Sequence, residues 1–271
     1  MNTLFAIIIT TIRESIRKKH LYVLLIFGIL VIILTSLANF FEMKEQTRFI
    51  KNISIFIIPI IGVVVATFSS ARQLPNEIED KSIHPLLVKP ISRWEYIIGK
   101  YLGVLVITWF SMLIISLIFL SFILLKSISI TATFFQCLLL FLIQIAIYIS
   151  IVLFFSTILS HGANIVLSLL LFVLLHSYGP KLNEIIIGST NPLYKTFLKI
   201  LFWIPPHFDY FNISSAVIYD YPEQSFIILI PFLIYAIIYI AIFLMLAGAI
   251  FSNKELWAHL CVKREILKLY F

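Results

Sequence analysis

The feature that most constrains this sequence is a series of long apolar stretches without any Lys, Arg, Asp or Glu. A helix of about 20 mostly apolar residues is long enough to cross the hydrocarbon core of a bilayer. Such stretches run over 21–40, 53–71, 102–125, 132–159, 163–179 and 224–250. The sequence therefore predicts an all-α integral membrane protein with six transmembrane helices, and we interpret residues 1–271 as a single transmembrane domain.

Composition and charge placement agree with a membrane protein. Apolar residues make up 61% of the chain and charged residues 12%, whereas about a quarter of the residues of soluble proteins are charged. With both termini in the cytoplasm, 13 of the 20 Lys and Arg residues fall on the cytoplasmic side, where positive charge beside spans is expected. We therefore expect a multi-pass protein of the cell (inner, or cytoplasmic) membrane, with both termini cytoplasmic and no nucleic acid partner.

Elements outside the spans can also be predicted. Leu4, Ile8, Ile12 and Ile16 recur every four residues, which indicates an amphipathic helix at the membrane interface before the first span. Residues 180–223 are rich in proline and aromatic residues, which favours one or two short helices at the outer membrane surface between the fifth and sixth spans. A proline inside the sixth span, Pro231, is expected to kink it.

The connection between the second and third spans has its own helix signals. Ser82 can cap a short cytoplasmic helix, which Pro90 then ends. Ser92 and Glu95 have the spacing of a capping box, so a second helix is expected to begin at Arg93 and continue into the third span. At the base of that span, the Gly-x-x-x-Gly pair Gly99 and Gly103 would let another helix approach closely.

The short cytoplasmic helix has an apolar surface, made by Leu86, Leu87 and Val88. Acidic residues precede this surface and basic residues follow it. Two interpretations fit equally well on physical grounds. Either the helix packs on the membrane face, as interfacial helices do, or it docks into a cytoplasmic partner.

This segment resembles the ABC transporter type 2 permease family. The family pattern is an acidic stretch, a Gly-Thr-Ile/Leu step, a Leu-Leu pair, Pro-Ile/Val-Ser-Arg, and a Gly-Lys that opens the third span. The matching positions here are Glu77, Asp80, Ser82, Ile83, Leu86, Leu87, Pro90, Ile91, Ser92, Arg93, Tyr96, Gly99 and Lys100. The sequence departs from the pattern at Lys81 and Pro85.

The resemblance implies that the loop is a coupling helix that contacts a separate ATPase. The residues implied in that contact are Glu77, Glu79, Asp80, Ser82, Ile83, Leu86, Leu87, Val88, Lys89, Pro90 and Arg93. The chain would then be a permease subunit of an exporter, paired with a second permease copy and two ATPase subunits that hold ATP and Mg²⁺. We expect no cofactor and no catalytic activity in this chain, because Gly99-Lys100 lacks the remaining residues of a phosphate-binding P-loop.

Few other residues suggest chemistry. Gln144, inside the fourth span, is interpreted as lining a pathway or as making an interhelical hydrogen bond. Ion-coupled carriers usually place ionisable groups within the membrane, and the predicted spans contain no carboxylate. His207 and Asp209 are two potential metal ligands without a third, so no metal site is predicted.

The resemblance leaves two functions open. In the first, the subunit exports a lipid-like, drug-like, glycan or peptide substrate. In the second, it passes ATPase motion mechanically to an extracytoplasmic partner without moving a substrate, as permeases of nitrous oxide reductase maturation machinery do. The residues of this chain name no substrate.

Overall fold

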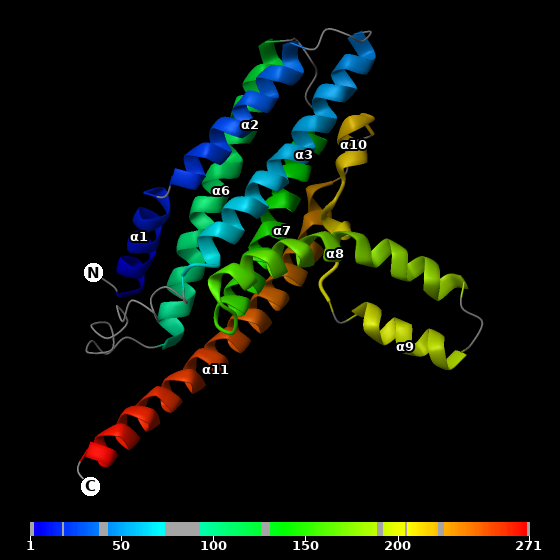
Figure 1. Cartoon of the computed structure of the whole chain (residues 1–271). Coiled ribbons are helices and arrows are strands. Elements are labelled where there is room, and N and C mark those ends of the chain that lie inside the picture. Colours follow the sequence, from blue (N-terminus) through cyan, green and yellow to red (C-terminus); the bar gives the residue numbers. More distant parts are fainter. Residues whose placement is uncertain are drawn as a thin grey trace.

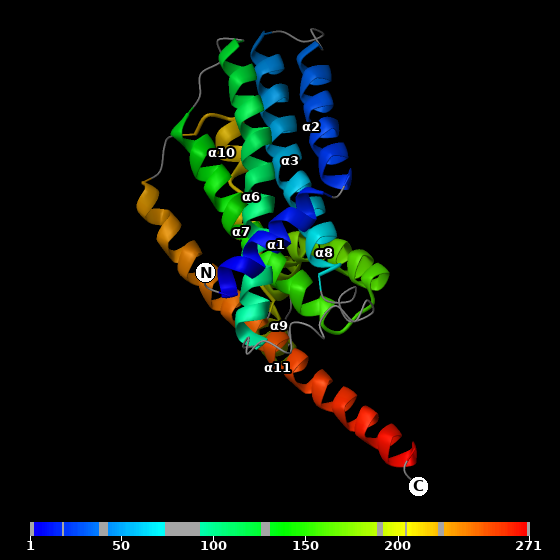
Figure 2. The same cartoon turned by 90° about the vertical axis from the view of Figure 1, so that its left-hand side faces the viewer.

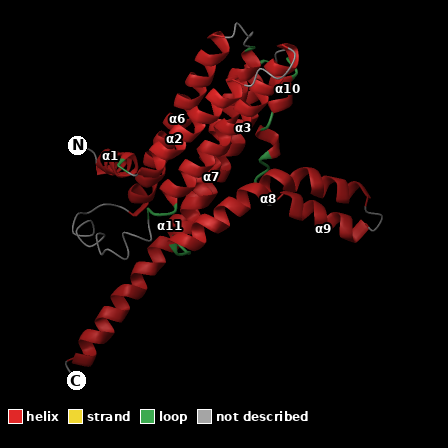
Figure 3. Cartoon of the chain, turned by 45° about the horizontal axis from the view of Figure 1, so that its top comes forward, coloured by secondary structure: helices red, strands yellow, loops and turns green. Residues whose placement is uncertain are grey.

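The computed structural model describes residues 3–17, 19–37, 43–73, 93–125, 131–188, 192–203, 205–221 and 225–269, and their regular structure is entirely helical (Figures 1 and 3). The helices are α1 (Thr3–Ile16), α2 (Lys19–Leu37), α3 (Met43–Ser70), α6 (Arg93–Leu125), α7 (Ala132–Ser156), α8 (His161–Gly188), α9 (Pro192–Trp203), α10 (Ser214–Ile218) and α11 (Leu229–Leu269). Two single-turn 3₁₀ helices, η1 (Asp209–Phe211) and η2 (Phe226–Ile228), complete the described elements.

Four helices, α2, α3, α6 and α7, run alongside one another as a bundle (Figures 1 and 2). The centre of the bundle is α7. Of the 18 residues that form its most apolar stretch, 72% are buried, whereas the corresponding share in α11 is only 6%. A buried hydrogen bond joins α7 to α3, with the Tyr148 and Thr67 hydroxyl oxygens 2.6 Å apart. The exposed apolar face of α11 is therefore a surface for lipid or for another chain.

Five described helical segments are long and apolar enough to cross a membrane: Thr47–Ser70, Arg93–Leu125, Ala132–Ser156, His161–Gly188 and Phe226–Ser252. The first predicted span, 21–40, overlaps α2 as far as Leu37, and residues 38–40 lie outside the described residues. The 19 residues of α2 correspond to a helix of about 28 Å at 1.5 Å per residue. The count of six spans remains a prediction.

Several predicted span boundaries differ from the helices observed, and the longest extension is that of α11, which continues to Leu269 where the sixth span was expected to end at residue 250. The second span was expected from residue 53, but α3 begins at Met43, because its charged first turns are helical without being apolar. The fifth span was expected to end at residue 179, but α8 continues through Pro180 to Gly188. A proline removes one intrahelical hydrogen bond, and the continuation is supported by packing of Leu182 and Ile186 on Leu198 of α9.

The helices α8 and α9 form a hairpin that extends away from the bundle (Figure 1). Short helices α9 and α10 thus lie between the last two predicted spans, while their place at an outer membrane surface remains a prediction. Pro231, which was expected to kink the sixth span from inside, lies instead in the first turn of α11. There its missing N–H has no intrahelical partner to lose.

The first helix is present as α1, and it packs into the protein by a different face from the stripe of Leu4, Ile8, Ile12 and Ile16, whose place at the membrane interface remains a prediction. The residues buried are Ile7, Thr11 and Ser15. The stripe residues are less buried within the protein, and Ile16 is exposed, as expected of side chains that face a membrane interface.

Candidate functional site

Most of the predicted coupling residues lie in segment 74–92, outside the described residues. This holds for Glu77, Glu79, Asp80, Ser82, Ile83, Leu86, Leu87, Val88, Lys89 and Pro90, whereas Arg93 is described. The residues on either side of the segment are described, because the turn after α3 reaches Gln73 and α6 begins at Arg93. We call the end of the bundle that carries Gln73 and Arg93 the loop end, and the other the far end.

At the loop end, the start of α6 is fixed to α11. The Arg93 Nη1 donates a hydrogen bond to the carbonyl oxygen of Ser252 at 2.7 Å. Trp94 lies so close to Gly248 that a Cβ on this glycine would be 2.4 Å from Trp94 Cζ3. Tyr96 stacks on Phe251, with ring centroids 5.8 Å apart. Hydrogen bonding and ring packing together therefore couple the beginning of α6 to the middle of α11.

Lys100 joins three elements within the protein. It is only 4% exposed, and its Nζ donates to Gln73 Oε1 at 2.9 Å. The same nitrogen lies 4.0 Å from Glu14 Oε2 of α1 and 5.6 Å from the centre of the Tyr96 ring. A buried ammonium needs such partners, because removing a charge from water is costly. Lys100 thus links α6 to α1 and to Gln73, the residue that precedes segment 74–92.

A third contact joins the same turn to α8. Arg72 Nε donates a hydrogen bond to His161 Nε2 at 2.8 Å. Because that ring nitrogen accepts the bond, it carries no proton. The residues before segment 74–92 are therefore attached to α8 and α6 through Arg72 and Gln73. The residue after it, Arg93, is attached to α11.

The structure places the two glycines of the Gly-x-x-x-Gly pair against α1. A Cβ on Gly99 would be 2.8 Å from Ile7 Cγ2, and one on Gly103 would be 2.6 Å from Thr11 Cβ. Both distances are shorter than carbon atoms tolerate, so only glycine permits this approach. The helix that approaches α6 here is the N-terminal helix α1.

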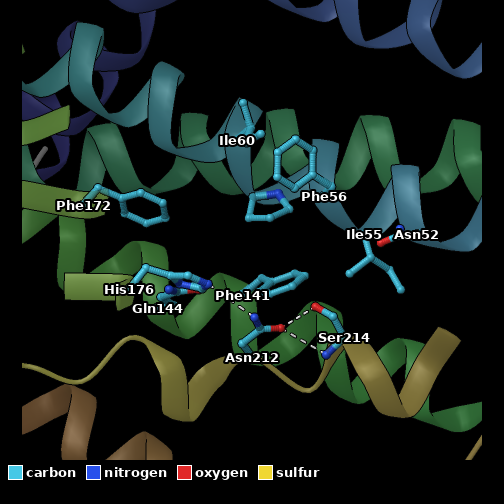
Figure 4. A pocket seen from close by; sticks show the side chains of 11 residues that line it. Asn52, Ile55, Phe56, Ile60, Phe141, Gln144, Phe172, His176, Asn212 and Ser214 are labelled. Atoms are coloured by element: carbon cyan, nitrogen blue, oxygen red, sulfur yellow. Dashed lines mark hydrogen bonds between the residues drawn. The ribbon is translucent and has the colours of Figure 1, made fainter. Parts of the chain in front are cut away.

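Gln144 is buried, and its Nε2 donates to the carbonyl oxygen of Phe208 at 3.4 Å. It also lines a pocket of about 290 Å³ toward the far end, shown in Figure 4. The lining residues come from α3, α7, α8 and the segment around α10: Asn52, Ile55, Phe56, Pro59, Ile60, Phe141, Gln144, Phe172, His176, Asn212 and Ser214. Gln144 thus bonds to the residue before η1 rather than to another helix and lines an open volume, while its place in a pathway remains a prediction.

At the far end, an ion pair beside this pocket joins α3 to the chain just after α10. Lys51 Nζ lies 2.6 Å from Asp220 Oδ1, and the Arg48 guanidinium lies over the Tyr219 ring at 5.7 Å. Asp220 has a φ of 51°, a left-handed conformation that Asp adopts more readily than most residues. The sequence shows Lys51 and Asp220 only as loop charges, since nothing local pairs two residues so far apart.

His207 is a packing residue in the described structure, whereas one carboxylate oxygen of Asp209 is buried without a hydrogen-bond partner. The His207 ring lies 4.2 Å from that of Phe202 and stacks on Tyr210, and its backbone N–H donates to the Tyr235 hydroxyl. Burial lowers the pKa of His207, an effect that the Asp209 charge and a hydrogen bond with the Pro205 backbone oppose. In the described part of the chain no three His, Cys, Asp or Glu side chains are grouped as metal ligands would be.

Comparison with known proteins assigns the chain to a family. A family profile described as ABC-2 family transporter protein matches residues 5–256. No curated protein matches the chain significantly. Proteins of this family are membrane subunits that normally work with an ATPase subunit. Because the match covers nearly the whole chain and the described spans are apolar helices, the chain belongs to the ABC-2 family of transporter membrane subunits.

Proposed function

We propose that the chain is the permease subunit of an ABC exporter and that segment 74–92 passes the motion of a separate ATPase to the membrane helices. The observation that supports this is the attachment of the residues on either side of the segment. Those before it are held to α8 and α6 through Arg72 and Gln73, and the residue after it, Arg93, is held to α11. A displacement of such a segment would move several helices together.

The decisive experiment removes the apolar surface of the proposed coupling helix. The double variant Leu86→Ala, Leu87→Ala is expected to insert into the membrane normally and to lose the co-purifying ATPase, because two buried leucines contribute on the order of 2–5 kcal/mol each. Glu79→Gln is the matched control, since an exposed ion pair is worth about 0–1 kcal/mol. A double variant with full ATPase binding and ATP-dependent turnover would contradict the proposal.

The proposed orientation places both termini and the loop end in the cytoplasm, with α2 as the first of six spans. Single cysteines at Lys19, Lys89, Lys254 and Lys195 can test it in a background lacking Cys137 and Cys261. In intact cells, an impermeant maleimide is expected to label only Lys195→Cys. Labelling of Lys254→Cys without permeabilisation would overturn the six-span arrangement.

A second copy of the chain and two ATPase subunits would complete the transporter. The apolar faces that α8 and α11 leave exposed offer room for a second permease. The isolated chain is expected to hydrolyse ATP negligibly, with ATP and Mg²⁺ bound by the partner. ATP hydrolysis at transporter rates by the chain alone, free of other polypeptides, would refute this division of labour.

The alternative function is mechanical transmission to an extracytoplasmic partner. The pocket beside Gln144 favours transport, because a subunit that only transmits motion has no need of an open volume among its helices. Measuring ATP-dependent transport and capture of an outer partner with the same preparation distinguishes the two functions.

A further inference from the structure

The far-end pocket has the shape of a binding site that opens sideways. Its volume is about 290 Å³, near the lower end of the range for small-molecule sites. Two residues of its α3 wall are solvent-accessible in the isolated chain, Phe56 at 67% and Ile60 at 39%. Both belong to the membrane-spanning part of α3. A molecule dissolved in the bilayer would therefore reach the pocket from the side.

The walls of the pocket are apolar and carry no ionic charge. Phe56, Phe141 and Phe172 supply aromatic surface, and Ile55 and Ile60 aliphatic surface (Figure 4). The lining includes no Asp, Glu, Lys or Arg. A charged group would therefore lose its water here without gaining a counter-ion, which is costly in a medium of low polarity. The pocket favours an uncharged ligand.

Two charged residues beside the pocket, Lys51 and Asp220, are paired with each other. Lys51, which precedes the lining residue Asn52, is paired with Asp220 at 2.6 Å. The pair joins α3 to the chain just after α10, on the wall that carries Ser214. It stabilises that wall and leaves no unpaired charge from these two side chains for a ligand.

One side of the pocket offers hydrogen-bonding groups. The Asn212 side-chain oxygen accepts from the backbone N–H of Ser214 at 3.1 Å and from its hydroxyl, and Asn212 Nδ2 lies 3.3 Å from His176 Nε2. This cluster holds the His176 ring in place, while the buried His176 Nδ1 has no hydrogen-bond partner among the described residues. Gln144 lines the same side and makes only a long hydrogen bond at 3.4 Å. A hydroxyl, carbonyl or amide group of a ligand would satisfy these atoms.

We propose that this pocket binds an uncharged amphiphile, with its apolar body against the aromatic wall and a neutral hydrogen-bonding group at His176 and Gln144. The inference deepens the proposed function and rests on it, because it names the class of molecule that would be moved. Binding can be measured without the ATPase, so its failure is distinct from failure of the coupling test.

The test uses the full chain in phosphatidylcholine nanodiscs and a diazirine-bearing monoacylglycerol as the neutral probe. Saturable photolabelling is expected at peptides containing Phe141 or His176, with labelling by a lysophosphatidate of the same chain length weaker by about tenfold or more. Ile60→Trp, which fills the pocket mouth, is expected to reduce labelling. Its matched control is Leu113→Trp, because Leu113 is also 39% exposed on a membrane-spanning helix but is not a lining residue.

The polar side is tested by His176→Phe, which keeps a ring beside Phe172 and removes the hydrogen-bonding nitrogens. Half-saturation by the neutral probe is expected to need about tenfold more ligand. Ser177→Ala, which alters an exposed neighbour outside the lining, is the control. Competition by unlabelled diacylglycerol would show that a two-chain membrane lipid fits the pocket, and competition only by the single-chain compound would limit the ligand to one chain; both support binding.

Several results would overturn the proposal. Labelling that does not saturate, that is equal for the two probes, or that Ile60→Trp leaves unchanged would indicate ordinary contact with the bilayer. Labelling that disappears when Phe56→Cys chains are cross-linked to each other would show that a second copy fills the opening. The thermal unfolding midpoint of each variant is measured on the same samples, so that loss of folding is not mistaken for loss of binding.

Discussion

The loop end of the bundle is held by polar side chains from α1, α6, α8 and the turn after α3, together with a backbone carbonyl of α11, whereas the far end combines an ion pair with aromatic surfaces around an open pocket. Lys100 is almost inaccessible and contacts partners on three elements. At the far end, Lys51 is equally inaccessible and pairs with Asp220, which is 47% exposed, much as Glu14 beside Lys100 is 45% exposed. The two ends therefore differ in the number of polar links between their helices, and we expect the far end to change shape more readily around a ligand.

The largest effect is expected where a buried charge loses its hydrogen-bond acceptor. Gln73→Leu leaves the Lys100 ammonium without its 2.9 Å partner, which should lower the free energy of unfolding by about 1.5–3 kcal/mol. Lys100→Met should cost less, because no charge remains buried. The double variant should cost less than the sum of the two single variants when unfolding is measured in mixed micelles. Additive losses would show that the two side chains do not stabilise the loop end as a pair.

A somewhat smaller effect is expected from filling the contact between α1 and α6. Gly103→Leu introduces a side chain where a Cβ alone would be 2.6 Å from Thr11 Cβ, so overpacking should cost about 1–3 kcal/mol. Limited proteolysis should then cleave α1 first. Gly162→Leu is the control, since a Cβ there meets no atom within 4 Å. Equal protection of α1 in both variants would mean that the loop end does not depend on close packing at Gly103.

At the far end, Asp220→Asn is expected to lower the free energy of unfolding by about 1 kcal/mol or less, because half-exposed ion pairs are screened by water. The difference from wild type should shrink further at high salt. The same unfolding assay at two salt concentrations measures both effects. A loss as large as that for Gln73→Leu would remove the contrast between the two ends.

The smallest effect concerns His207, which lies between α9 and η1. Because burial lowers the pKa of His207, the folded protein keeps the ring neutral at a pH where the unfolded chain, with a pKa of about 6.5, already binds a proton. The stability that the neutral ring contributes is present above about pH 6.5 and is lost as the pH falls toward the lowered pKa. His207→Phe should therefore flatten the decline of the thermal midpoint between neutral and mildly acidic pH. An unchanged decline would assign it to other groups.

Local sequence patterns determined much of the helical framework. Uncharged apolar stretches predict helices because backbone polar groups in lipid must be satisfied within the segment, and the described spans fall on five of the six predicted stretches. The same patterns underestimated the lengths of α3 and α8, since a helix can extend past its apolar part wherever tertiary contacts support it. The resemblance to the family came from residues 76–100, most of which lie outside the described structure, so their roles remain predictions.

What the sequence by itself determined, then, is that this chain is a helical membrane protein of the ABC-2 family, because hydrophobicity and a local motif are properties of neighbouring residues. Only the tertiary structure decided which polar groups meet. Lys51 and Asp220 are 169 positions apart, and Arg93 and Ser252 are 159 apart. The face that α1 buries and the residues that line the pocket were likewise set by packing between distant helices. No local pattern encodes such contacts, because they depend on how whole helices approach one another through small residues and satisfy buried charges.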